Sequence, residues 1–167
     1  TIEENFALAG NRGKKPGLRW GVTRRDHKAF QEKIRLLGLG LEYRLKDRVG
    51  LLSGGQRQSL TLLMATLQRP RILLLDEHTA ALDPPTAAQV LKLTQELIQE
   101  MELTSIMVTH NMRHALELGN RLVMMHGGKI ILDVAGEEKR RLTVQDLLNE
   151  FAKLKGDAVA DDKMLLI

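Results

Sequence analysis

The sequence predicts an α/β fold in which two parallel strands are joined by a crossover helix. Two short apolar runs, 72–75 and 104–109, have the length of strands, and the first is typical of a buried parallel strand. The segment between them reads as one helix, and a strand, a helix and a second strand form a βαβ crossover. With 167 residues, 43% of them hydrophobic, the chain suits one ordinary domain or part of one.

The first third is predicted to be helical and surface-like. Residues 1–9 and about 23–37 read as helices, separated by a loop rich in Gly, Pro and Lys over 10–21. Residues 1–50 hold 12 Lys and Arg against 6 Asp and Glu, a basic excess that suits nucleic acid or an anionic membrane surface. Because the chain has only five aromatic residues to stack on bases, we expect a solvated loop and no nucleic-acid partner.

Two longer helices are predicted on either side of the first strand. The helix over 53–68 ends before Pro70, and its buried face consists of Leu60, Leu63, Met64 and Leu67. The crossover helix begins with Asp83 as N-cap and two prolines at its first positions. Its buried stripe consists of Val90, Leu93, Leu97, Ile98 and Met101.

The last third is predicted to hold a hairpin and a helix. The short runs 122–125 and 129–133 flank Gly127 and Gly128, which is typical of a β-hairpin. An amphipathic helix follows, and the tail after Gly156 is assigned no structure. The chain has no cysteine and no apolar stretch of the about 18 residues that span a membrane, so we expect a cytoplasmic protein.

A glycine pair opens the predicted helix over 53–68, in the sequence Leu-Ser-Gly-Gly-Gln. Ser53 with Gln56 three residues later forms a capping box, which needs no function. Two glycines at a helix start also let a backbone approach closely, and the amides and dipole of that start suit a phosphate. The two interpretations are evenly matched on this motif alone.

Candidate catalytic residues follow the two predicted strands. Asp76 and Glu77 end the first strand; a carboxylate suits Mg²⁺, which takes oxygen ligands, and a second carboxylate suits the polarisation of an attacking water. His110 follows the second strand and should share the same sheet edge. A strand that ends at the surface in ordinary acids remains the alternative.

Together these features resemble the ATP-binding subunits of ABC transporters. Residues 52–56 resemble the family's L-S-G-G-Q signature, 72–77 its Walker B strand with the following Glu, and 80–83 its D-loop. His110 resembles the switch histidine, so that four motifs occur in the family's order. The resemblance implies an incomplete P-loop NTPase fold of the ABC type, with a helical subdomain and the Walker B half of the parallel sheet.

The resemblance also implies a role for each motif residue. In this family two nucleotide-binding domains face each other, and ATP lies between the phosphate loop of one and the signature of the other. The residues implied to contact the γ-phosphate held by the partner subunit are Ser53, Gly54 and Gly55, and Gln56 is implied to belong to the same ATP-binding motif. Asp83 is expected to couple the two sites. Asp76 is expected to hold Mg²⁺, Glu77 to activate the water, and His110 to sense the γ-phosphate.

The resemblance divides the chain into three parts and implies its partners. A helical subdomain with the signature is expected over 1–68, half of the catalytic core over 69–135, and a helix and tail over 136–167. The implied partners are a second copy of the subunit and membrane permease subunits, which would place the protein on the inner face of the cell membrane. Bacterial solute import is favoured. A soluble ABC ATPase acting on DNA or the ribosome, and a degenerate dimerisation module, are the alternatives.

Two features depart from the family pattern. The family usually reads Asp-Glu-Pro-Thr where this chain has His78 after Glu77, so the turn loses a proline's rigidity. No G-x-x-x-x-G-K-[ST] phosphate loop occurs in the sequence, and the chain starts without Met, so we expect a piece of a longer ATPase. This chain alone is expected neither to bind nor to hydrolyse ATP, and to leave strand edges unpaired.

Overall fold

The computed structural model describes residues 1–13 and 22–155, with side chains to residue 152. It divides the chain into two compact units, Thr1–Met107 and Val108–Ile167. Most of the predicted loop over 10–21, and the tail after Gly156, lie outside the described residues. The predicted division into 1–68, 69–135 and 136–167 is based on sequence motifs, whereas the two units are defined by their compact packing. The predicted division stays a prediction.

The first unit begins with two capped helices. α1 spans Ile2–Gly10 and α2 spans Arg24–Arg35, and each starts with a threonine capping box. The two helices are joined through their aromatic residues, since the rings of Phe6 and Phe30 lie 5.1 Å apart, edge to face. Two short 3-10 turns, η1 at Leu41–Tyr43 and η2 at Val49–Leu51, lead to the next helix.

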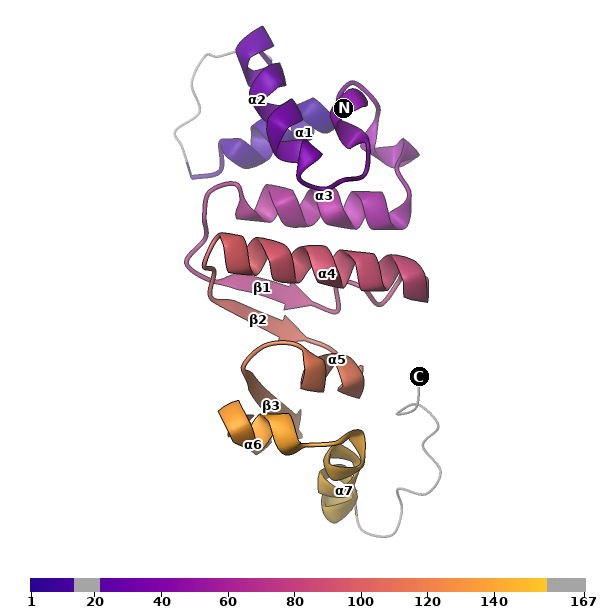
Figure 1. The fold of residues 1–167 in the computed structure, drawn as a ribbon, viewed down its shortest axis with the longest axis vertical. Helices are drawn as coiled ribbons and strands as arrows, with labels where there is room; N and C mark the ends of the chain where they lie inside the picture. The colour runs from indigo at the N-terminus through magenta and orange to yellow at the C-terminus, as the bar shows by residue number, and fades with distance from the viewer. Residues whose placement is uncertain (14–21, 156–167) are drawn as a thin grey trace. The chain divides into compact units, whose positions relative to one another are not determined.

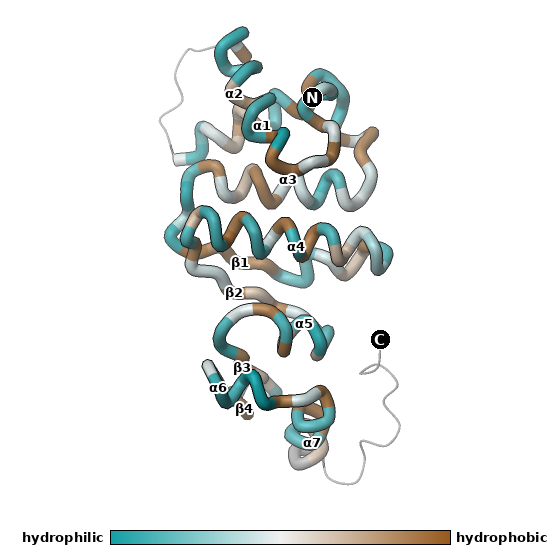
Figure 2. Tube along the Cα trace, in the orientation of Figure 1, coloured by the Kyte–Doolittle hydropathy of each residue, from teal (hydrophilic) through white to brown (hydrophobic). Residues whose placement is uncertain are grey.

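The core of the first unit lies between two long helices and a strand. α3 spans Gly54–Thr66 and α4 spans Pro84–Glu100, and the two helices pack side by side (Figure 1). Hydrophobic and hydrophilic residues alternate along both helices, as Figure 2 shows. The residues buried between them and the strand include Leu60, Leu63, Leu73, Leu75, Leu93 and Leu97. Both helices follow the sequence prediction, and their buried faces follow it in part. The predicted residues that are only half-buried are Met64, Leu67, Ile98 and Met101, and Leu62 and Leu91 are buried without having been predicted.

The predicted βαβ crossover is confirmed. β1 spans Leu73–Asp76 and β2 spans Ser105–Val108; they form a two-stranded sheet, and α4 connects them (Figure 1). The first strand is predicted to be buried, and this is wrong for one of its faces, because its residues alternate between buried and exposed. Leu74 is 71% exposed, since α4 covers one face of the strand only.

The second unit contains the predicted hairpin. β3, Arg121–His126, pairs antiparallel with β4, Lys129–Ala135. Gly127 and Gly128, at the turn, have φ values of 53° and 74°, which glycine adopts without steric cost. The terminal helix α7 spans Val144–Lys155.

Two short helices of the second unit were not predicted from the sequence. α5 spans Met112–Glu117 and α6 spans Gly136–Arg141. Lys139 of α6 is 5% exposed, and its Nζ donates to the carbonyls of Leu116, Leu118 and Gly119 at 2.5, 2.9 and 3.1 Å. These carbonyls lie at the end of α5, so the ammonium caps that helix. Burial lowers the pKa of Lys139.

In the described part of the chain, no helix is both long and apolar enough to cross a membrane.

Candidate functional site

The capping box predicted at the start of α3 is confirmed. The Ser53 hydroxyl accepts from the Gln56 backbone at 3.2 Å, and Gln56 Oε1 accepts from the Ser53 backbone at 3.1 Å. The box fixes the direction in which the helix begins and leaves Ser53 exposed. The contact of Ser53 and Gln56 with a phosphate stays a prediction.

The two glycines of this helix start face different surroundings. Gly55 is buried, and a Cβ placed on it would lie 2.2 Å from Thr86 Cγ2. Gly54 is exposed, and its Cβ would lie 3.1 Å from Leu82 Cδ2. Packing against α4 therefore requires Gly55, whereas Gly54 keeps an exposed backbone that a phosphate could approach.

Asp83 caps the helix that packs against these glycines. Its carboxylate accepts from the backbone of Thr86 at 3.1 Å. Hydrogen bonds from the side chain and the backbone of Thr86 hold the pKa of Asp83 below its usual range. Thr86 thus contacts both Asp83 and the α3 start, a link that the sequence analysis did not predict. The one sequence feature that could have indicated Thr86 is its position three residues after the N-cap Asp83. The coupling role of Asp83 stays a prediction.

Asp76 and Glu77 are both exposed at the end of β1. Glu77 has φ of 42°, a left-handed conformation that is uncommon for residues other than glycine. A turn follows, in which the Ala80 backbone donates to the Glu77 carbonyl at 3.0 Å. Arg69 and Glu102 adopt the same conformation, so it shows that the surroundings constrain this turn and does not by itself assign a function to Glu77.

The turn after Glu77 is attached to α4 despite the missing proline. His78 Nε2 lies 3.1 Å from Oγ1 of Thr94, which is fully buried in the core. The sequence singled out His78 only as a departure from the family pattern. The structure gives it a specific partner.

The residues present suit a metal that brings other ligands with it. The described residues include no group of three or more His, Cys, Asp and Glu side chains able to hold a metal by themselves. Mg²⁺ in nucleotide sites commonly takes one or two carboxylates and completes its shell with phosphate oxygens and water. The exposed carboxylate of Asp76 fits that arrangement, and metal binding there stays a prediction.

Only part of the predicted site lies within the first unit. The α3 start and the α4 start are in contact within the first unit. His110 is exposed between β2 and α5 and belongs to the second unit, and the neighbouring Asn111 caps α5 through its bond from the His114 backbone at 3.1 Å. The placement of His110 beside the carboxylates stays a prediction.

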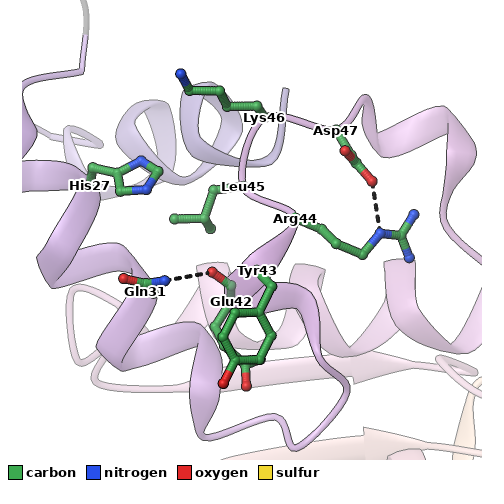
Figure 3. Close-up of a pocket in the computed structure, with 8 residues that line it drawn as sticks. All are labelled: His27, Gln31, Glu42, Tyr43, Arg44, Leu45, Lys46 and Asp47. Carbon is green, nitrogen blue, oxygen red and sulfur yellow. Dashed lines mark hydrogen bonds and ion pairs between the residues drawn. The ribbon is translucent and has the colours of Figure 1, made fainter.

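A hollow of about 320 Å³ lies elsewhere in the first unit. Figure 3 shows the side chain of Gln31 donating to the Glu42 carbonyl at 3.1 Å, and Arg44 bonded to Asp47 at 2.7 Å. Oε2 of Glu42 is buried and has no hydrogen-bond partner among the described residues. A buried oxygen is closed to a ligand in the hollow, so we assign no site there. The lining consists of His27, Gln31, Glu42, Tyr43, Arg44, Leu45, Lys46 and Asp47.

Comparison with known proteins gives consistent matches. A family model described as ABC transporter matches residues 1–80. The chain is 45% identical over 151 residues to the tyrosine transport ATP-binding protein of Clostridioides difficile, covering 90% of this chain and 60% of that protein. It is 38% identical over 146 residues to the methionine import ATP-binding protein MetN of Clostridium tetani, covering 80% and 46%.

A solved structure supports the fold. An inward-facing structure described as a metal-chelate type ABC transporter matches with a TM-score of 0.71 at 24% identity, over 90% of this chain and 57% of that one. This likeness confirms the predicted ABC-type fold. The chain spans about half the length of the relatives it matches.

Proposed function

We propose that this chain belongs to the ABC transporter family and is part of the ATP-hydrolysing subunit that energises import of a small solute. The observation that carries the proposal is the junction of α3 and α4. There the Ser-Gly-Gly helix start packs on a helix that directly follows the Asp76–Glu77 strand end. The two relatives above are named as transport and import ATP-binding proteins, which supports a transport role.

The α3 start suits the γ-phosphate of an ATP held by a second subunit. Ser53 and Gly54 are exposed there, and a helix N-terminus offers amide donors and a positive dipole end to an anion. Gln56 shapes this start through the capping box, and Gly55 fixes it against α4. We therefore propose that the signature works across an interface between two copies of the subunit.

The carboxylates suit hydrolysis. Mg²⁺ bound with ATP would neutralise charge on the phosphates, and Asp76 is the side chain that would hold it. Glu77 would accept a hydrogen bond from the attacking water and orient it. His110 would contact the γ-phosphate, and Asp83 at the head of α4 would link the two sites. Permease subunits in the membrane would receive the resulting motion, which places the subunit on the inner face of the membrane.

The substitution Gly54→Asp in the full-length subunit tests the interface. A carboxylate at the helix start should repel the partner's phosphate, so hydrolysis should fall at least about tenfold while ATP affinity of the isolated monomer is kept. Gly50→Asp is the matched control, because Gly50 is also exposed and a Cβ there meets nothing within 4 Å. An equal loss of monomer affinity and activity would contradict the proposal.

We infer that this chain alone neither binds nor hydrolyses ATP. The amides and lysine that cradle the β- and γ-phosphates belong to a phosphate loop, and no such motif occurs in the sequence. Calorimetry with Mg-ATP should show no binding heat for this chain. Binding at micromolar concentration would show that the signature side suffices for a site.

A further inference from the structure

The contacts of Thr94 determine which ring nitrogen of His78 carries a hydrogen. The Thr94 hydroxyl donates to the carbonyl of Val90 at 2.7 Å, one turn earlier in α4. His78 Nε2 lies 3.1 Å from the same hydroxyl oxygen. A hydroxyl has one hydrogen, and Val90 accepts it, so the oxygen must accept from His78. Nε2 of His78 therefore carries a hydrogen and donates it to Thr94.

This bond attaches the Glu77 turn to a rigid element. Thr94 is fully buried, and it lies about three turns into α4. Asp83, at the other end of the turn, caps the start of the same helix. The turn from Glu77 to Asp83 is thereby held to α4 at two separated points.

The backbone of Glu77 needs such support. Its φ of 42° is a conformation that non-glycine residues adopt only when the surroundings impose it. Position 78 has no proline ring to restrict the turn covalently. The bond between the Ala80 backbone and the Glu77 carbonyl closes the turn locally, and His78 is the side chain next to Glu77 that reaches the core.

We propose that His78 is a positioning residue that holds Glu77 in its working orientation by donating from Nε2 to Thr94. The inference rests on the proposed function, because it assumes that Glu77 orients the attacking water. A small displacement of such a group lowers the rate of the chemical step more than the affinity for substrate.

Paired variants of the full-length subunit test this proposal. His78→Phe keeps a ring of similar size without a donor, and Thr94→Val removes the acceptor; each should lower kcat for ATP hydrolysis about tenfold, with KM changed less than about twofold. His78→Gln retains an N–H donor and Thr94→Ser retains the hydroxyl, so both should stay within about threefold of the wild-type kcat. Thermal midpoints measured in parallel separate a loss of fold from a loss of positioning.

A spectroscopic measurement on the wild-type subunit needs no variant. Nitrogen-15 NMR of labelled histidine should show the His78 ring protonated at Nε2. A ring protonated only at Nδ1, a wild-type kcat in His78→Phe, or an equal loss in His78→Gln would overturn the proposal. Glu77→Gln, measured in the same assay, distinguishes a failure of the His78 proposal from a failure of the proposed function. If Glu77→Gln retained ATPase activity, the proposed role of Glu77 in hydrolysis would itself be contradicted.

Discussion

Gly55 and the carboxylate pair of this chain lie in opposite surroundings. Gly55 is buried against Thr86, and its backbone has no space for another atom. Asp76 and Glu77 lie exposed at a strand end, where the backbone of Glu77 adopts a left-handed conformation. Substitutions at the buried glycine should therefore act through stability, whereas substitutions at the exposed acids should act through chemistry.

The largest expected effect is on turnover. Glu77→Gln in the full-length subunit should lower ATP hydrolysis at least about 100-fold, because the amide cannot act as a base. ATP binding should be kept, since Asp76 and the side-chain size are unchanged. The thermal midpoint should also stay near wild type, because Glu77 is exposed. Steady-state ATPase assays and thermal melts measure both, and activity within a few-fold of wild type would remove the role assigned to Glu77.

The next effect is on stability. Gly55→Ala should destabilise the protein by about 1–3 kcal/mol, because its Cβ would overlap Thr86 Cγ2. Adding Thr86→Ser, which removes that methyl group and keeps the hydroxyl, should restore most of the loss. Gly50→Ala is the control, since a Cβ there meets nothing within 4 Å. Urea unfolding measures all three, and a double variant no more stable than Gly55→Ala would show that the contact is not the cause.

The smallest effect concerns the cap of α4. The folded pKa of Asp83 lies below its usual value of 3.8 because Thr86 hydrogen-bonds to the charged form. The stabilisation is therefore complete above about pH 4 and is lost as the pH falls through the folded pKa. Asp83→Asn keeps an acceptor but removes the charge. The thermal midpoint of the wild type should lie slightly above that of this variant at pH 7, and the difference should be smaller at pH 3. A difference that grows on acidification would contradict the stabilising role assigned to the charged Asp83 cap.

Local signals in the sequence predicted the helices and turns well where one residue type dictates the backbone. Asp83 with its two prolines begins α4, Ser53 with Gln56 begins α3, and Gly127–Gly128 turns the hairpin, as each pattern indicated. α5 and α6 were missed. Each has only six residues, too few to show a helical period, and α5 is held by Lys139 from a later part of the chain.

The sequence by itself determined the order of the elements, the capped helix starts, and the four motifs that resemble those of ABC transporter ATP-binding subunits. These depend on neighbours within a few residues or on residue identity alone. Only the tertiary structure decided that Gly55 meets Thr86, that Leu74 lies on an uncovered face, and that His78 bonds to Thr94. Each of these contacts or exposures depends on how segments distant along the chain pack in space, and no local pattern encodes which side chains then meet.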